Sequence, residues 1–226
     1  MTSLLIFLSS LALYVFTLAP SVPPQGDAGE LITVAYTLGI AHPPGYPLFT
    51  LLAHLFTYIP INSIAWRVNL FSAVCSAATL VFIYLIIKKI TKNNLAGIGA
   101  AAILGLSQTF WLYSLVTEVF ALNNLFTVLI IYLALEKRWL LLSFVLGLSL
   151  SNHHTIILIF PALIYLIYKN FKFSFVSCFL FLVGLLPYIY FYIRAKTAIM
   201  PVAWSYPDTL PALLKLISRS DYCTFS

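Results

Sequence analysis

The sequence predicts an all-α polytopic membrane protein. Hydrophobic residues make up 62% of the chain and charged residues only 8%, whereas soluble domains carry roughly 25% charged residues. The hydrophobic residues form long runs, which short basic clusters or polar turns separate. Runs of about 20 apolar residues have the length that an α-helix needs to cross a bilayer. We therefore interpret the net charge of +6 as a signal of membrane topology, and we expect no nucleic-acid partner.

The first apolar run, 4–19, is slightly short for a span and could instead be a signal peptide. Because no Lys or Arg precedes it and a proline follows at once, we expect a retained first span. The stretch 20–63, rich in Pro and Gly, should lie outside the membrane core. Within it, the apolar periodicity predicts two short helices over 28–38 and 48–58.

Further spans are expected wherever the later hydrophobic runs are long enough. These runs are 64–87, 95–112, 119–135, two short spans within 139–168, and 173–193. The run 95–112 is rich in Gly and Ala, which allows close contact between helices. The tail 200–226 is mixed in composition, and a short surface helix is expected over 210–217.

The run 139–168 decides the predicted topology, because polar residues at 151–154 interrupt it. As one helix it would measure about 45 Å, which exceeds the bilayer core of about 30 Å. Two short spans would place every basic cluster on one side, which the positive-inside rule prefers. The clustered residues are Lys88, Lys89, Lys92, Lys137, Arg138, Lys169 and Lys172. The sequence therefore predicts about seven spans and a cytoplasmic N-terminus.

Two of the six acidic residues, Asp27 and Glu30, lie in the loop 20–63. Asp27 is placed to be the N-cap of the helix 28–38, and Glu30 completes the spacing of a capping box. Gly39 stands where a glycine would end that helix. A functional site is the other interpretation, and the two are compatible, because a helix N-terminus keeps a carboxylate ionised. An ionised carboxylate could accept a proton from a hydroxyl or hold a cation.

Other polar groups are expected on the same, non-cytoplasmic side. A helix over 139–150 rises only about 18 Å, so the turn at 152–154 should sit within membrane depth and line a wet cavity. Ionisable groups at that depth are functional candidates, with a solvated turn as the structural alternative. Adjacent histidines point in different directions on a helix, and no CxxC pattern occurs, so we expect no metal site. The candidates are Glu30, His42, Arg67, Glu118, Asn152, His154, Arg194 and Arg219.

Several long motifs resemble one protein family. The run GDAGELITVAYTLGIAHPPGYPLF, from Gly26, resembles the first luminal loop of the transmembrane protein 260 family. Further matches follow in order: AWRVNL at 65–70, TEVFALNNLF at 117–126, GLSLSNHHTIIL at 147–158, GLLPY at 184–188 and the final DYCTFS. By this resemblance, residues 1–226 form the N-terminal part of a GT-C-like transmembrane domain with a helical, catalytic first loop, and the family's C-terminal region is absent.

The resemblance also implies a function. The family is similar to protein O-mannosyltransferases of the GT-C superfamily, which implies a multi-pass enzyme of the endoplasmic reticulum membrane. Such an enzyme would move mannose from dolichyl phosphate mannose to Ser or Thr of a luminal protein domain; for animal members these are immunoglobulin-like, plexin, transcription-factor domains. It would need no cofactor besides the lipid-linked donor. Its expected partners are membrane lipid, that donor and the acceptor protein.

Residues and resemblance together suggest roles. Asp27 is expected to act as general base, taking the hydroxyl proton as the Ser or Thr oxygen attacks the anomeric carbon with inversion. Arg67 and Arg219 are expected at the donor phosphate, because guanidinium binds phosphate bidentately. The residues expected at sugar hydroxyls or beside Asp27 are Glu30, His42, Glu118, Asn152 and His154. The alternatives are a transporter, although the internal repeat typical of transporters is not found, and a non-catalytic membrane scaffold.

Overall fold

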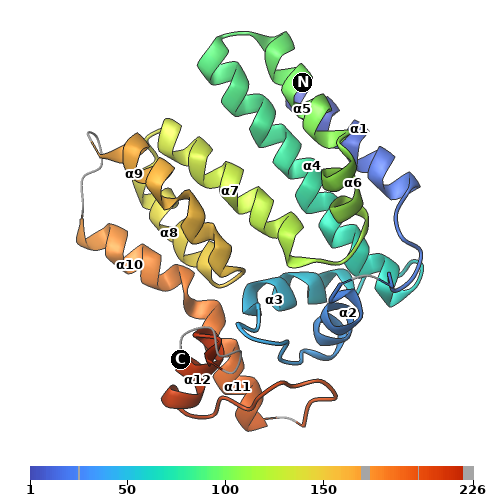
Figure 1. Ribbon diagram of the computed structural model, residues 1–226, viewed down its shortest axis with the longest axis vertical. Coiled ribbons are helices and arrows are strands. Elements are labelled where there is room, and N and C mark those ends of the chain that lie inside the picture. Colours follow the sequence, from blue (N-terminus) through green and yellow to red (C-terminus); the bar gives the residue numbers. More distant parts are fainter. Residues whose placement is uncertain (25, 169–173, 198, 221–226) are drawn as a thin grey trace.

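The computed structural model is built of α-helices and short 3-10 helices (Figure 1). It describes residues 1–24, 26–168, 174–197 and 199–220. Within those ranges, the only pairing of the β type is an isolated parallel bridge between Ile40 and Ala203. The prediction of an all-α fold is confirmed.

The helices follow the predicted hydrophobic runs, with some changes at their ends. Their bounds are α1 (Thr2–Phe16), α2 (Ala28–Thr37), α3 (Pro47–Phe56), α4 (Ile64–Thr91), α5 (Asn94–Gly105), α6 (Gln108–Leu115), α7 (Val119–Leu135), α8 (Trp139–Leu150), η1 (His154–Ile159), α9 (Phe160–Ile167), α10 (Phe175–Gly184), η2 (Leu186–Tyr188), α11 (Ile189–Thr197) and α12 (Leu210–Ile217). The central helix α4 packs against α1, α5 and α7, and α8 packs against α7 and α10. The loop helices α2 and α3 lie across one end of this bundle (Figure 1).

Among the residues that the structure describes, two helical segments are long and apolar enough to cross a membrane: Ile64–Thr91, and Phe175–Thr197 when α10, η2 and α11 are taken together. The 28 residues of α4 correspond to about 42 Å. The pair α5 and α6 passes the same test together, although its two parts meet at 68°. Five further apolar helical segments in the described ranges have 10 to 17 residues: Thr2–Phe16, Pro47–Phe56, Val119–Leu135, Trp139–Leu150 and His154–Ile167. The expected number of about seven spans stays a prediction.

The expected span over 95–112 stays a prediction, and the structure adds a bend within it, between α5 and α6. At the end of α5, the carbonyl of Gly105 accepts a hydrogen bond from the hydroxyl of Tyr14 in α1, at 3.0 Å. Ser107 then adopts an extended backbone and begins α6. A tertiary contact from another helix thus accompanies a break that the apolar pattern alone did not indicate. The predicted interruption at 151–154 is confirmed, because α8 ends at Leu150 and the 3-10 helix η1 begins at His154.

The expected capping of α2 is wrong. Asp27 is the N-cap residue, but its carboxylate makes no capping hydrogen bond. Glu30 does not reach back to the N–H of Asp27, since its carboxylate binds His42 instead. At the other end, Leu38 rather than Gly39 has the left-handed backbone, with φ of 54°. The guanidinium of Arg194 donates to the carbonyl of Leu38 at 2.8 Å and thereby supplies a partner to the helix end.

The structure places the basic residues at the end of α4 and the acid at the start of α7 at opposite ends of the bundle. Lys89 at the end of α4 forms an ion pair with Glu136 after α7, at 3.0 Å. At the other end of α7, Glu118 contacts the backbone of Asp27. Figure 1 shows the N-terminus near the connection between α4 and α5, at the basic end. Lys169 and Lys172 lie outside the described residues.

This arrangement predicts the outcome of cysteine labelling. Single cysteines at 27 and 154 should react with an impermeant reagent from one side of the membrane, and cysteines at 88 and 137 from the other, because basic clusters stay cytoplasmic. Glu118 belongs to the first side but is buried, so a cysteine there should react poorly. The variants belong in a background without Cys75, Cys178 and Cys223. Restoring the buried Cys75 alone provides an unreactive control. Labelling at 88 and 154 from the same side would contradict the topology.

Candidate functional site

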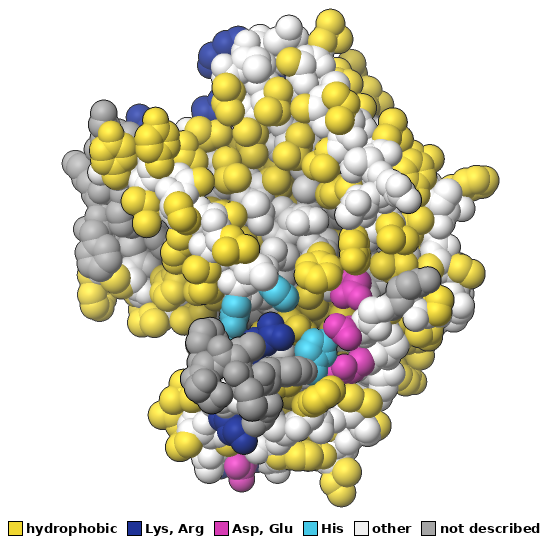
Figure 2. Space-filling view, viewed as in Figure 1, with side chains coloured by type: hydrophobic (Ala, Val, Ile, Leu, Met, Phe, Trp, Pro, Cys, Tyr) yellow, Lys and Arg dark blue, Asp and Glu magenta, His cyan; other side chains and the backbone are white. Residues whose placement is uncertain are grey.

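Acidic and histidine side chains gather in a hollow on one face of the molecule, with a basic side chain beside them (Figure 2). The acidic and histidine residues of this hollow lie at the start of α2, in the loop after α2 and in the connection between α6 and α7. We call Asp27, Glu30, His42 and Glu118 the acid–histidine cluster. Asp27, Glu30 and Glu118 are three of the six acidic residues in the whole chain.

The sequence HPPGYP places the histidine of this cluster. His42 is buried, and its carbonyl accepts the N–H of Gly45 at 2.8 Å, which closes a tight turn. The Pro43–Pro44 peptide bond within the turn is cis. Tyr46 follows with a left-handed backbone and begins α3, with Pro47 at the first helical position. The turn brings the side chains of His42 and Tyr46 together, with their ring centroids 5.1 Å apart.

Glu30 holds His42 through two contacts. Its Oε1 accepts the backbone N–H of His42 at 2.6 Å, and its Oε2 lies 3.1 Å from the ring nitrogen Nδ1. The other ring nitrogen, Nε2, lies 2.9 Å from the hydroxyl of Tyr46 and 3.6 Å from Oδ2 of Asp27. The imidazole of His42 therefore lies between two carboxylates.

These contacts shift the ionisation of both partners. Burial alone would raise the pKa of Glu30, but hydrogen bonds from His42 outweigh it and the net pKa is lowered. The hydrogen bond with Glu30 raises the pKa of His42, against burial, which lowers it. The charge of Asp27 raises it further, and the charge of Arg219 acts in the opposite direction. The cluster thus favours an ionised Glu30 and a more basic imidazole than usual.

Glu118 fixes the backbone at the start of α2. Its side chain is buried, with 6% of the residue exposed, and its Oε1 accepts the N–H of Asp27 at 3.2 Å. Burial raises the pKa of Glu118, the N–H of Asp27 lowers it, and the negative charge of Asp27 raises it again. Glu118 therefore takes the place that Glu30 would have in a capping box. It supports Asp27 from a position 91 residues away in the sequence.

Gly26 lies directly against the Glu118 carboxylate that holds the backbone of Asp27, so a side chain at position 26 would disturb this contact. The φ of Gly26 is +64°, and a Cβ built there would collide with Oε1 of Glu118. Gly26→Ala should lower the free energy of unfolding by about 1–2 kcal/mol, and with it the melting temperature, because an L-residue is strained at this φ. It should also weaken any activity that depends on Asp27. The matched control is Gly29→Ala in α2, where the new Cβ would meet Val22 at an ordinary 3.5 Å. Equal melting temperatures for the two variants would contradict the prediction.

The turn after α8 lies against the same region. The carbonyl of Ser151 accepts the N–H of Leu48 at the start of α3, at 3.1 Å. The ring of His153 stacks on Tyr46 with centroids 5.6 Å apart. Nε2 of His154 lies 3.1 Å from the hydroxyl of Tyr188. Ser151 and His153 thus bring the turn against the loop that holds His42, and His154 contacts Tyr188 instead. The roles expected for Asn152 and His154 stay predictions.

Asn152 is buried, with 1% of the residue exposed. Its Nδ2 donates to the carbonyl of Val119 at 3.4 Å, immediately after Glu118. Its Oδ1 is buried and has no hydrogen-bond partner among the described residues. A buried acceptor without a partner is costly, so a ligand hydroxyl would relieve that cost.

The two candidate arginines have different surroundings. The guanidinium of Arg67 donates to three backbone carbonyls: Nε to Ile61 at 2.6 Å, Nη1 to Thr57 at 2.9 Å and Nη2 to Asn62 at 2.9 Å. Arg67 thus ties together the backbone of the connection between α3 and α4. This structural role explains the arginine at this position without a bound phosphate.

Arg219 lines an open groove of about 900 Å³, which also includes His154, Ile157, Leu214 and Lys215. The groove combines cationic and apolar side chains. Because the charge of Arg219 affects His42, the groove lies near the cluster.

The structure also brings in residues that the sequence did not indicate. Trp204, from the tail after α11, hydrogen-bonds the carboxylate of Glu30 and packs its ring edge-on against His42 at 6.1 Å. The backbone of this tail pairs with Ile40, since the N–H of Trp204 donates to the Ile40 carbonyl at 3.1 Å. In the sequence, the only sign of a role for Trp204 in the site was a tryptophan in a tail of mixed composition. Tyr46 was missed because its hydroxyl contact with His42 depends on the turn.

The cluster also resembles a metal site in outline. One ligand atom from each of Asp27, Glu30 and His42 lies within 4.8 Å of the others. However, Nδ1 of His42 already bonds Glu30, and Nε2 bonds Tyr46. A metal would need a neutral imidazole with a nitrogen turned toward the ion. The contacts within the cluster fit an imidazole held by carboxylates better, and the expectation of no metal stays a prediction.

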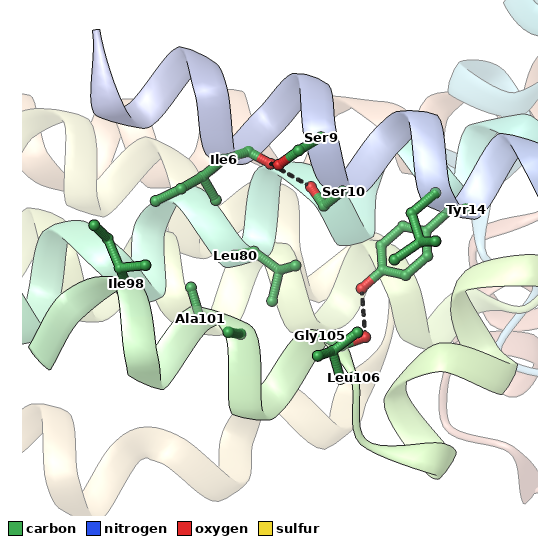
Figure 3. Close-up of a pocket in the computed structure, with 11 residues that line it drawn as sticks. Ile6, Ser9, Ser10, Tyr14, Leu80, Ile98, Ala101, Gly105 and Leu106 are labelled. Atoms are coloured by element: carbon green, nitrogen blue, oxygen red, sulfur yellow. Dashed lines mark hydrogen bonds between the residues drawn. The ribbon is translucent and has the colours of Figure 1, made fainter. Parts of the chain in front are cut away.

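A separate cavity of about 230 Å³ lies between α1, α4 and α5 (Figure 3). Its walls are mostly apolar, and its polar groups are bonded within the protein, as Tyr14 to Gly105 and Ser10 to Ile6. None of its lining residues belongs to the acid–histidine cluster. This cavity supplies no groups for acid–base chemistry.

Together, these features define a helical membrane protein whose first loop carries a cluster of carboxylates around a buried histidine. The chain belongs to the family of the protein O-mannosyl-transferase TMEM260 N-terminal domain, whose model matches residues 27–177. The predicted family is confirmed. No solved structure matches the chain significantly.

Two curated relatives match nearly the whole chain. The protein O-mannosyl-transferase TMEM260 of Mus musculus is 37% identical over 99% of this chain and 35% of its own length. The protein O-mannosyl-transferase tmem260 of Dictyostelium discoideum is 33% identical over 97% of this chain and 30% of its own length. The chain therefore spans about a third of the length of these relatives.

Proposed function

We propose that the chain provides the catalytic loop and donor site of a protein O-mannosyltransferase in the endoplasmic reticulum membrane. It transfers mannose from dolichyl phosphate mannose to Ser or Thr of a luminal protein domain. The names of both relatives, protein O-mannosyl-transferases, support mannose transfer. The observation that carries the proposal is the exposure of Asp27, whose side chain is 57% accessible while the groups behind it are buried or partly buried.

Asp27 is the general base in this proposal. Its backbone is held by Glu118, and its carboxylate faces the hollow beside His42. The acceptor oxygen forms a bond to the anomeric carbon as its proton passes to Asp27. The bond from that carbon to the phosphate oxygen breaks, and its electron pair leaves with dolichyl phosphate. The configuration at the anomeric carbon is inverted, and the proposed step uses no metal.

The groove beside α12 is the proposed place for the donor. Arg219 would hold the phosphate, and the apolar side chains of Ile157 and Leu214 would contact the lipid. One charge pair at about 4 Å contributes about 4 kcal/mol before desolvation, at an effective dielectric constant of about 20. The sugar would lie between Asp27 and the turn at 152–154, where Oδ1 of Asn152 could accept a hydroxyl. His154 lines the same groove.

The donor site predicts a difference between the arginines. Arg219→Ala should weaken binding of dolichyl phosphate mannose at least tenfold, because a phosphate loses its cation. Arg219→Lys should restore only part of the affinity, since Lys lacks the planar fork. Arg67→Ala should instead lower stability, because three carbonyls lose their donor. Arg138→Ala, at the opposite end of the bundle, is the control. If Arg219→Ala binds the donor as the parent does, the phosphate lies elsewhere, and Lys196 is the next candidate.

Transfer itself is tested with the protein in membranes. Microsomes that contain the chain receive dolichyl phosphate mannose with labelled sugar and a purified immunoglobulin-like or plexin-type acceptor domain. Mannose on Ser or Thr of that domain, above the level in microsomes without the chain, is the expected result. Labelled donor that binds but is never transferred would contradict the proposal.

A further inference from the structure

The two ring nitrogens of His42 face different carboxylates. Nδ1 faces the carboxylate of Glu30 at 3.1 Å, and Nε2 faces Oδ2 of Asp27 at 3.6 Å. Glu30 also binds the backbone N–H of His42, which fixes the distance between the ring and the carboxylate. An ionised Glu30 can only accept, so Nδ1 carries the hydrogen and the neutral ring has its lone pair on Nε2. Nε2 lies 2.9 Å from the hydroxyl of Tyr46 and 3.6 Å from Oδ2 of Asp27, so a proton can reach it from either neighbour. A carboxylate that orients a histidine in this way is a recurrent device in nucleophilic catalysis.

We propose that the Glu30–His42 pair takes over the hydroxyl proton that Asp27 removes from the acceptor, so that His42 is a positioning residue acting through Asp27. This inference rests on the proposed function and extends it by one proton transfer. Imidazoles ordinarily hold a proton more tightly than carboxylates do. The transfer therefore returns Asp27 to its ionised form, ready for the next acceptor.

The step balances with the groups that are present. Asp27 gains the proton as the new oxygen–carbon bond forms, and then donates it to Nε2 of His42. The imidazolium that results carries Nδ1–H toward Glu30, and it later releases one proton to water. The hydroxyl of Tyr46, 2.9 Å from Nε2, donates to the neutral ring and can turn to accept from the charged ring.

The charges around His42 support this role. The groups that face it or feel its charge are Asp27, Glu30, Tyr46, Glu118, His153, Trp204 and Arg219. The hydrogen bond with Glu30 has the largest influence and raises the pKa of His42. Trp204 donates to Glu30 and covers one edge of the imidazole. The proton is thus received in a partly buried place with two carboxylates beside it.

A second histidine provides a matched control. His54 faces Tyr58 four residues later, as His42 faces Tyr46, with Nε2 to hydroxyl distances of 2.9 Å in both pairs. The ring centroids are 5.0 Å apart in one pair and 5.1 Å in the other. The difference is the partner of Nδ1, which is the carbonyl of Ala35 for His54 and the carboxylate of Glu30 for His42. The His54 pair therefore has the geometry without the acid.

The experiment combines two measurements on the membrane protein. The first is an NMR titration of the histidine rings in the parent, Glu30→Gln and Asp27→Asn. The pKa of His42 should lie above the ordinary value in the parent and fall in both variants, with the larger fall in Glu30→Gln. The second is the rate of mannose transfer against pH. The rate should rise with pH through the pKa of His42, because only the neutral ring can accept a proton.

The variants separate the relay from a structural role. Glu30→Gln should move the acidic limb of the rate profile to lower pH and reduce the plateau at least tenfold. His42→Gln should remove that limb, and His54→Gln should leave the profile unchanged. A His42→Gln enzyme with the parent's limb would overturn the relay, as would a limb that Glu30→Gln does not move.

The relay and the proposed function fail in different ways. If no variant or parent transfers mannose, the proposed function is wrong, and the relay falls with it. If the parent transfers mannose and Asp27→Asn does not, but the His42 variants keep the parent's profile, the function stands and the relay is wrong.

Discussion

Asp27→Asn is expected to abolish mannose transfer and to leave the protein folded. The amide cannot take the hydroxyl proton, and loss of a general base typically lowers the rate about 10²–10⁴-fold. The fold should survive for two reasons. The carboxylate makes no capping hydrogen bond, and the contact with Glu118 uses the backbone N–H, which Asn keeps. The contact with His42 at 3.6 Å involves a mostly exposed side chain, where an ion pair contributes about 1 kcal/mol or less.

Two controls distinguish chemistry from structure. Asp208→Asn changes an exposed carboxylate in the tail and should not affect transfer. Asp27→Ala should be as inactive as Asp27→Asn and nearly as stable, because neither variant loses a side-chain cap. The measurements are initial transfer rates and melting temperatures in detergent. Near-normal transfer by Asp27→Asn, with destabilisation only in Asp27→Ala, would show that Asp27 is structural.

Gly147→Leu is expected to have the largest effect on stability. Gly147 in α8 lies against α10 so closely that a Cβ would collide with the carbonyl oxygen of Phe181 and come within 2.9 Å of Cα of Gly184. Backbone atoms cannot turn aside as a side chain can, so α8 and α10 must separate. Overpacking costs about 1–3 kcal/mol even where side chains can adjust, and we expect at least the upper end here. The turn at 152–154 follows α8 directly, and His154 in it contacts Tyr188, four residues after α10, so donor binding should fail as well.

The control for this variant is Gly99→Leu in α5, where a Cβ would meet nothing within 4 Å. Both substitutions place a leucine in an apolar helix, so a general effect on helix propensity would appear in both. Thermal unfolding in detergent, followed by size-exclusion chromatography, measures the difference. If Gly147→Leu melts with Gly99→Leu, the close packing of α8 on α10 is not needed for stability.

The sequence by itself determined the features that depend on local patterns. Long apolar runs separated by polar turns predicted the helices, and the polar residues after Leu150 predicted the break between α8 and η1. The same patterns placed α2 and α3 inside the loop 20–63. Long uninterrupted motifs, above all the one from Gly26, were enough to predict the family. These predictions succeed because the length and period of a hydrophobic run depend on the secondary structure of that run, and they need no knowledge of its tertiary contacts.

Only the tertiary structure decided which partner each polar group takes. Spacing assigned Glu30 to the cap of α2, but the folded chain offers it the ring and N–H of His42, and Glu118 binds Asp27 instead. At the end of α2, the carbonyl of Leu38 likewise accepts a hydrogen bond from Arg194, 156 residues away in the sequence. A capping box contributes about 1 kcal/mol, so a buried charged hydrogen bond from a distant residue can outweigh it. Such competition is settled by packing between remote segments, which spacing along the chain does not describe.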